Sequence, residues 1–378
     1  MGNLIGRLEA GIGGPGDNAV VPTLLLGSHL DTVRSAGRFD GALGVLLPIV
    51  ALEELRRWRR RLPFAVEVLG FSEEEGVRFS SAYLGSKGYS GCLGPKDLKL
   101  RDRDGITVRE ALARYDSRDR GGALRLLHPA HRARELLGYL EVHIEQGPVL
   151  EDKDLAVGVV SAIAGQTRGR LIFRGRAGHA GTTPMRLRRD AFAGAAEAVL
   201  LAEAEARGCP GLAATVGQVF LAPGAPNVIP GEAILTLDLR HPEHAVRRRA
   251  LGRIVAQARA AARRRRLGLD WQPTQDDDGI ICSPDLTALL AQSVRSVQGK
   301  GAALVSGAGH DAVVMSVLAP VAMLFVRCRD GLSHHPDEHA APRDLGVALQ
   351  VVMDFLERLA VAGPAEAGRR GQRHRLQR

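Results

Sequence analysis

Four short apolar runs constrain the fold of this chain more than any other feature, because each has the length of a strand buried on both faces. They are Val21–Leu26, Phe64–Phe71, Gly138–Val142 and Val321–Val326. Helical patterns lie between them, for example at Gly44–Arg60. This alternation of strands and helices favours an α/β fold built on a mostly parallel sheet.

The segment 164–276 has a different pattern. Its expected elements are a strand, a helix, two strands, a helix and a short strand, at Arg168–Arg174, Asp190–Arg207, Ala213–Phe220, Glu232–Leu239, His244–Arg266 and near Leu269. Two helices over an antiparallel sheet indicate a separate α+β unit. We therefore expect a main domain in two parts, 1–163 and 277–378, with a smaller domain inserted at 164–276.

Charge and composition exclude several classes of partner. The chain has 378 residues and a formal net charge of +9, but much of the excess lies at Arg263–Arg266 and in a tail from about 364. Aromatic residues are only 4% of the chain, so no stacking platform indicates nucleic-acid binding. The four cysteines have no paired spacing, and no unbroken apolar stretch is long enough to span a bilayer. We expect a cytoplasmic protein that binds neither nucleic acid nor membrane.

Polar groups that can bind metal ions follow all four apolar runs. The groups are Gly27–Asp31, Ser72–Gly76, His143–Gly147 and, after a short turn, Gly331–His335. Ligands bind at the carboxyl ends of parallel strands, so these groups are expected to meet in one crevice. Histidine and carboxylate together suit zinc, manganese, cobalt or nickel.

Each of these groups also has a simpler interpretation. Asp31 is placed to hold the ring of His29, or else only caps a turn beside a surface histidine. Asp40 precedes a helix and taken alone is best interpreted as its N-cap. Three adjacent carboxylates, Glu73–Glu75, repel one another unless a cation or proton relieves them. One could bind metal while its neighbour acts as a general base, or all three could form a solvated acidic turn.

Eight strings between about residues 2 and 340 resemble the dinuclear-metal M20 amidohydrolases. The nearest resemblance is to the branch of N-carbamoyl-L-amino-acid hydrolases, β-ureidopropionases and allantoate amidohydrolases. The strings are GSHLDTV, GRFDGALGV, SEEEGVRF, EVHIEQGPVLE, AGHAGTTPM, NVIPGE followed by DLR, SGAGHDA and GLSHHPDE. Their number and order carry the resemblance, since any one of them alone would be modest evidence.

The resemblance implies two divalent metal ions per subunit. His29 and His143 would bind one ion, Glu75 and His334 the other, and Asp40 would bridge the pair. Glu74 would be the catalytic base, and Asp31 would orient His29.

The resemblance also implies substrate contacts and a homodimer. Contacts are expected from Gln146, His179, Asn227, Arg240 and His310. The inserted domain would close over the metals and form the dimer, with His179 donated across the interface.

The implied reaction is hydrolysis of the ureido C–N bond of an N-carbamoyl-L-amino acid or allantoate by a metal-bridging hydroxide, with release of ammonia and carbon dioxide. A second interpretation is an M20 dipeptidase or aminoacylase that cleaves an ordinary amide. A third is a catalytically silent relative that only binds a ligand.

Overall fold

The computed structural model of the protein describes residues 1–11, 21–115 and 136–362. The expected basic tail from about 364 lies outside these residues. The chain divides into two compact units, Met1–Ser161 with Ile281–Arg378, and Ala162–Ile280. Within the described ranges, no helix is both long and apolar enough to cross a membrane.

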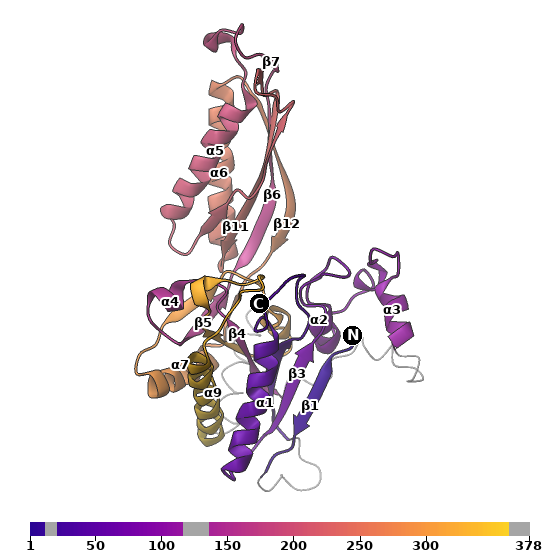
Figure 1. Ribbon diagram of the computed structural model, residues 1–378, viewed down its shortest axis with the longest axis vertical. Coiled ribbons are helices and arrows are strands. Elements are labelled where there is room, and N and C mark those ends of the chain that lie inside the picture. Colours follow the sequence, from indigo (N-terminus) through magenta and orange to yellow (C-terminus); the bar gives the residue numbers. More distant parts are fainter. Residues whose placement is uncertain (12–20, 116–135, 363–378) are drawn as a thin grey trace. The chain divides into compact units, whose positions relative to one another are not determined.

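An eight-stranded sheet forms the centre of the first unit (Figure 1). Its order is β1-β3-β2-β4-β15-β5-β13, with β14 paired to β5. The strands are β1 Leu4–Leu8, β2 Thr23–His29, β3 Ala65–Phe71, β4 Leu136–Ile144, β5 Val157–Ile163, β13 Ile280–Ile281, β14 Ala303–Ser306 and β15 Val321–Val326. Strands β3, β2, β4 and β15 run parallel, whereas β1 and β5 are antiparallel to their neighbours. The prediction of an α/β fold with a mostly parallel sheet is confirmed.

Several helices of the first unit pack on this sheet: α1 Ala42–Arg57, α7 Pro284–Gln298, α8 Asp311–Met315 and α9 Pro342–Ala362. The unit also contains α2 Leu84–Ser90, α3 Val108–Tyr115 and α4 Val149–Asp152. Leu47 of α1, Leu290 of α7 and Phe355 of α9 join apolar side chains of the parallel strands in the largest core cluster. Burying side chains of this size stabilises the unit by about 1.5–3 kcal/mol each.

The second unit is an antiparallel sheet covered by two helices. The sheet order is β12-β6-β11-β8, with β9 also paired to β11, and β7 and β10 form a separate two-stranded pair. The elements are β6 Gly165–Arg174, β7 Gly178–His179, α5 Ala191–Arg207, β8 Ala213–Thr215, β9 Val219–Ala222, β10 Val228–Ile229, β11 Glu232–His241, α6 His244–Arg264 and β12 Gly268–Asp277. Alternate residues of β11 are buried under the helices, as expected for a sheet with one covered face.

Two expectations for this unit were wrong in detail. The expected strand Ala213–Phe220 is two strands, β8 and β9, which pair with different parts of β11. The strand near Leu269 is not short, because β12 is ten residues long and nine of them pair with β6. The register shifts between Pro273 and Gln275, and this irregularity explains why the alternation of β12 is hard to follow in the sequence.

The parallel strands bring their carboxyl ends to one edge of the first unit. His29 is the last residue of β2 and lies opposite Phe71, the last residue of β3. His143 lies near the end of β4, opposite Phe325 of β15. Residues that follow β3 and β15 therefore emerge beside the two histidines.

Candidate metal centre

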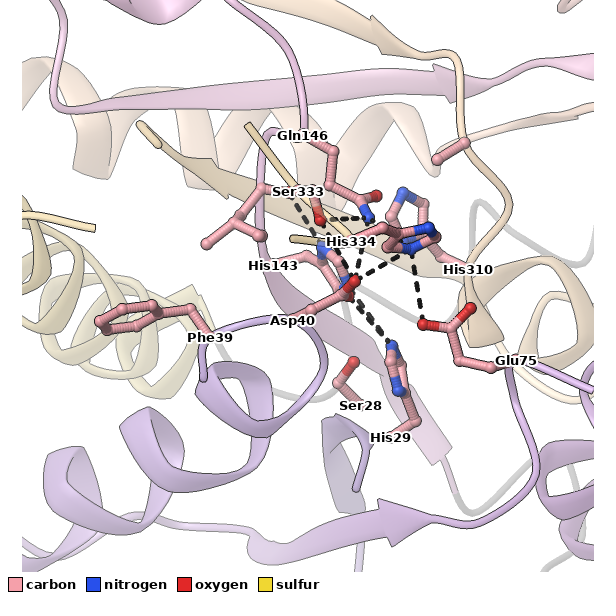
Figure 2. Close-up of polar contacts among 12 residues, drawn as sticks. Ser28, His29, Phe39, Asp40, Glu75, His143, Gln146, His310, Ser333 and His334 are labelled. Carbon is pink, nitrogen blue, oxygen red and sulfur yellow. Dashed lines mark hydrogen bonds and ion pairs between the residues drawn. The ribbon is translucent and has the colours of Figure 1, made fainter. Parts of the chain in front are cut away.

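Asp40 lies at the centre of a cluster drawn from five separate segments (Figure 2). One of its oxygens, Oδ1, is 3.6 Å from Nε2 of His29 and 3.1 Å from Nε2 of His143. The other, Oδ2, is 3.1 Å from Nε2 of His334, which is 3.5 Å from Oε1 of Glu75. The structure thus brings together two groups that share one carboxylate: the His29–Asp40–His143 group and the Asp40–Glu75–His334 group.

The donor atoms of both groups fit a divalent cation. Ligand atoms around a tetrahedral ion with bonds of about 2.1 Å are about 3.4 Å apart, and the distances here are 3.1–3.6 Å. Oε1 of Glu75 is buried and accepts no hydrogen bond, an expensive arrangement for a carboxylate unless a cation is its partner. Imidazole and carboxylate donors suit zinc, manganese, cobalt and nickel alike.

The electrostatics of the cluster also favour positive charge. Burial alone would raise the pKa of Asp40, but hydrogen bonds from His143, His29 and His334 outweigh it and hold that pKa far below its usual range. The bond to Asp40 raises the pKa of His334. Burial would lower the pKa of His29, but Asp40 and the charge of Glu74 raise it well above its usual value. A buried anion that is surrounded in this way attracts either protons or metal ions.

Asp40 does not cap helix α1. The residue at the N-cap position is Gly41, with a φ of 69° and no capping side chain. A Cβ on Gly41 would lie 2.3 Å from Nδ1 of His29, so only glycine fits between the helix and that ring. The capping interpretation of Asp40 is therefore wrong, and the glycine-rich turn presents its carboxylate to the three histidines.

Asp31 holds His29 through its main chain. Nδ1 of His29 is 2.7 Å from the carbonyl oxygen of Asp31 and 4.0 Å from its carboxylate. The carboxylate instead accepts hydrogen bonds from the backbone N–H groups of Glu74 and Glu75, at 3.1 and 3.2 Å. Asp31 therefore orients the His29 ring through its carbonyl and not through its side chain. Both carboxylate oxygens of Asp31 are occupied by the turn after β3.

Glu74 is 7% exposed and lies beside the two groups. Its carboxylate, with His29 and Glu75, forms a third set whose ligand atoms are within 4.8 Å of one another. Burial raises the pKa of Glu74 well above its usual value. A carboxyl group that holds a proton easily next to a metal centre is suited to general base and acid work.

Gln146 and His310 lie at different depths. Nε2 of Gln146 is 3.2 Å from Oδ2 of Asp40 and 3.1 Å from Oγ of Ser333, so this amide is in the cluster. His310 is 1% exposed, and its ring packs edge-on against His143 with centroids 4.6 Å apart. Burial lowers the pKa of His310 well below its usual value. As placed here, His310 supports His143 and offers no surface for the substrate contact expected of it.

His179 and Asn227 lie together in the second unit. The pair β7–β10 places His179 opposite Val228, and the N–H of Ala180 donates to the carbonyl of Asn227 at 2.9 Å. Nδ1 of His179 accepts hydrogen bonds from the N–H groups of the two residues after Ala180, at 3.1 and 3.2 Å. A neutral His179 ring therefore carries its proton on Nε2.

Arg240 lies on β11 and is held by Asp238. Its Nε and Nη2 donate to the two oxygens of Asp238 at 3.1 and 2.9 Å, and Nε of Arg168 donates to the same carboxylate at 2.8 Å. These three side chains line a hollow of about 520 Å³ on the second unit. Two guanidinium groups on one carboxylate leave a net positive charge there, which suits an anionic ligand.

Several buried polar groups near the cluster were not predicted from the sequence. Glu141 is fully buried and accepts hydrogen bonds from Oγ of Ser28 and the N–H of Ala312, at 2.8 and 2.9 Å. Burial raises the pKa of Asp311 to about 8. Glu338, 5% exposed, binds the loop that carries Asp40. The available signal was a charged residue within a buried strand for Glu141, and the strings SGAGHDA and GLSHHPDE for the other two.

The fold and this cluster define a class of protein, the α/β metallohydrolases. Comparison with known proteins is more specific: the chain belongs to peptidase family M20/M25/M40, whose model matches residues 25–358. An allantoate deiminase of Arabidopsis thaliana is 38% identical over 94% of this chain and 72% of its own length.

Two further relatives agree with this placement. An N-carbamoyl-L-amino acid amidohydrolase of Geobacillus stearothermophilus is 36% identical over 95% of this chain and 85% of its own. The crystal structure of a hydantoinase/carbamoylase family amidase from Burkholderia multivorans matches with a TM-score of 0.85 and 31% identity. That match covers 95% of this chain and 85% of the other.

Proposed function

We propose that the protein is a metal-dependent amidohydrolase that cleaves the ureido C–N bond of an N-carbamoyl-L-amino acid or of allantoate. The observation that carries the proposal is the shared carboxylate of Asp40, which faces two histidines with one oxygen and His334 with the other. Amidohydrolases named for these two substrates are 36–38% identical to this chain over nearly its whole length.

The proposed reaction adds one water to the ureido carbonyl carbon. The bond to the amino-acid nitrogen breaks, that nitrogen takes a proton, and the carbamate released decomposes to ammonia and carbon dioxide. Two bound divalent cations, held by His29, Asp40, Glu75, His143 and His334, would supply Lewis acidity and lower the pKa of water. Glu74 would accept the proton of the attacking water and deliver it to the leaving nitrogen.

The second unit offers groups for the substrate. Arg240 would bind the substrate carboxylate, since a guanidinium can donate two parallel charge-assisted hydrogen bonds and a lysine cannot. His179 carries a donor at Nε2, because its Nδ1 accepts two backbone hydrogen bonds, and this donor would meet the developing oxyanion. Asn227 and Gln146 would bind the remaining polar atoms.

The dimensions of the second unit support a homodimer with shared sites. β7 lies at the end of this unit where β6 ends and β11 begins (Figure 1). Arg240 is eight residues into β11, which at about 3.3 Å per residue is about 26 Å from that end. One small substrate cannot contact both His179 and Arg240 of the same chain. We therefore propose that each site takes His179 and Asn227 from one copy and Arg240 from the other.

A surface for this pairing is available on the same unit. Strand β9 pairs with β11 and exposes Val219, Phe220 and Leu221, at 45%, 55% and 37%. Apolar side chains on a strand at the edge of a sheet favour association with another copy. We propose that residues 164–276 form the dimer through this edge.

We expect His179→Ala to lower turnover by about 10²–10³-fold, the usual cost of removing a donor to a developing oxyanion. Coexpression with Glu74→Gln tests the shared site. In random mixing, half of the dimers are mixed, and each has one complete site, so activity should return to about a quarter of the wild-type value. Steady-state ammonia release from the purified mixture measures it. Activity that stays at the level of the two parents would contradict donation across the dimer.

The proposed function has a direct test. Metal-free protein is supplied in turn with zinc, manganese, cobalt or nickel and incubated with N-carbamoyl-L-amino acids, N-carbamoyl-β-alanine and allantoate. N-acetyl amino acids and dipeptides serve as the comparison for ordinary amides. We expect ammonia release that depends on added metal and is abolished by a chelator. Faster cleavage of the N-acetyl compounds would favour the aminoacylase alternative, and no cleavage by a metal-loaded protein would favour a ligand-binding relative.

We also propose that the protein works in the cytoplasm. All four cysteines are free thiols, and two of them, Cys282 and Cys328, are buried. A reducing compartment keeps such thiols in this state.

A further inference from the structure

We propose that Glu338 is a positioning residue that ties the Asp40 loop to the His334 loop and thereby sets the affinity of the Asp40–Glu75–His334 group for its cation. This inference rests on the metal centre of the proposed function. Glu338 belongs to neither of the two ligand groups, and its hydrogen bond to Asp40 is to the backbone N–H. Its effect on a cation would be exerted through the two loops it joins.

Within the described residues, the side-chain hydrogen bonds of Glu338 go to these two loops. It is 5% exposed, and its Oε1 accepts hydrogen bonds from the N–H groups of Phe39 and Asp40, at 2.9 and 3.1 Å. Its Oε2 accepts the hydroxyl of Ser333 at 2.9 Å. One buried carboxylate therefore fixes the main chain of Asp40 and the residue before His334, which lie about 300 positions apart along the chain. Hydrogen bonds to an ionised acceptor are about twice as strong as neutral ones.

Ser333 can bond either of two carboxylates. Its Oγ is 2.9 Å from Oε2 of Glu338 and 3.2 Å from Oδ2 of Asp40 (Figure 2 shows the second contact). A hydroxyl has one proton to donate, and the shorter contact is with Glu338. Glu338 thus turns this proton away from Oδ2, which is the oxygen that faces His334.

The surrounding chain is built to admit this side chain. A Cβ on Gly37 would lie 2.3 Å from Cβ of Glu338 and 2.4 Å from its Oε1, so any larger residue at 37 would displace the carboxylate. The N–H of Glu338 also donates to the carbonyl of His335 at 3.0 Å, which closes the turn that follows His334. Both the Asp40 loop and the His334 loop are therefore shaped around Glu338.

Glu338→Gln separates the bonds of this residue to the backbone of Phe39 and Asp40 from its bond to the hydroxyl of Ser333. The glutamine oxygen still accepts the N–H groups of Phe39 and Asp40, but its amide nitrogen cannot accept the hydroxyl of Ser333. That hydroxyl then bonds to Oδ2 of Asp40 and competes with the cation. Residues that hold metal ligands in place typically change metal affinity by about 10–100-fold when altered, and we expect this range for one of the two cations.

The measurement is titration of metal-free protein with Mn²⁺ by calorimetry, with kcat and KM determined at each metal concentration. We expect Glu338→Gln to weaken one binding step by about 10–100-fold and leave the other within about 3-fold. At saturating Mn²⁺, kcat should recover while KM for the substrate stays unchanged. A residue that only stabilised the fold would not produce this recovery.

Two further variants keep the test decisive. Ser333→Ala removes both the competing hydroxyl and the hydrogen bond that joins the two loops, so we expect a loss of about 3–10-fold in the same binding step. The double variant should match Ser333→Ala rather than Glu338→Gln. Glu67→Gln is the matched control, because Glu67 is 6% exposed and bonded to Arg7 and Tyr89, and is not part of the cluster. It should bind Mn²⁺ like the wild type. If Glu338→Gln does not fold, the step-specific loss in Ser333→Ala decides the question.

Different outcomes overturn different conclusions. Equal Mn²⁺ affinities in Glu338→Gln, Ser333→Ala and wild type would overturn the role of Glu338 and leave the proposed function intact. A wild-type protein that binds no Mn²⁺, Zn²⁺ or Co²⁺ would overturn the metal centre itself, and the role of Glu338 with it.

Discussion

Glu74→Gln is expected to lower turnover by about 10³–10⁴-fold and to leave both cations bound, because an amide cannot accept the proton of the attacking water. The side chain keeps its size, so the buried position that leaves Glu74 only 7% exposed is preserved. Turnover measured on metal-loaded protein and metal content by elemental analysis check the two parts. Near-normal turnover would show that another group is the base.

Glu75→Gln is the matched control for this result. The two glutamates are adjacent, but only Glu75 belongs to a group with Asp40 and His334. Burial and the charge of Asp40 raise the pKa of Glu75, as expected for a carboxylate without a cation partner. We expect Glu75→Gln to lose metal as well as activity, and its activity to respond to added metal. The opposite pattern, with metal lost from Glu74→Gln alone, would exchange the roles of the two residues.

The meeting of these polar groups could be predicted from the sequence, because the carboxyl ends of parallel strands lie at one edge of a sheet. An apolar run of five to eight residues marks each parallel strand, and the polar residues at its end must emerge at the carboxyl edge. His29 and His143 lie at or near the ends of β2 and β4, and Glu75 and His334 lie in the segments that follow β3 and β15. Their convergence could therefore be predicted, whereas the role of each as a metal ligand was implied by the family resemblance. The sheet edges were harder to predict, because residues 216–218 separate β8 from β9 and the register of β12 shifts after Pro273.

The groups that hold the ligands could not be predicted in this way. Whether His29 bonds the carbonyl or the carboxylate of Asp31 depends on a turn after β3 that competes for the carboxylate. In the sequence, Glu338 is one of several charged residues in a polar loop. Only the folded structure shows that it accepts hydrogen bonds from the N–H groups of Phe39 and Asp40. Such contacts join distant segments, and no local pattern records them.

The distance between His179 and Arg240 in one chain bears on whether the protein acts as a dimer. The length of strand β11, which the sequence shows well, already separates His179 from Arg240 by more than a small substrate can span. If both residues bind one substrate molecule, a second copy of the chain must supply one of them, so that each active site depends on the pairing of two copies. If the proposed homodimer forms, agents that separate its two copies should abolish activity without removing metal.

Asp40→Asn is expected to lower activity by at least about 10³-fold and to reduce bound metal to one cation or none per chain. An asparagine offers one oxygen, and its amide nitrogen cannot bind a cation, so the two groups would no longer share a ligand. Elemental analysis after gel filtration measures the loss. The matched control is Asp344→Asn, a carboxylate 2% exposed that pairs with Arg327 at 2.8 and 2.9 Å and should retain both cations.

The thermal stability of metal-free wild type and metal-free Asp40→Asn tests the contact between Asp40 and His334 independently. Because Asp40 raises the pKa of His334 and its own pKa is lowered, their attraction stabilises the fold between about pH 4 and 6.5 and weakens as the pH rises through the folded pKa of His334. We therefore expect Asp40→Asn to lower the Tm of metal-free protein more at pH 5.5 than at pH 8.5. A Tm difference that is the same at both pH values would mean that Asp40 and His334 do not interact as charges, and would count against a shared cation between them.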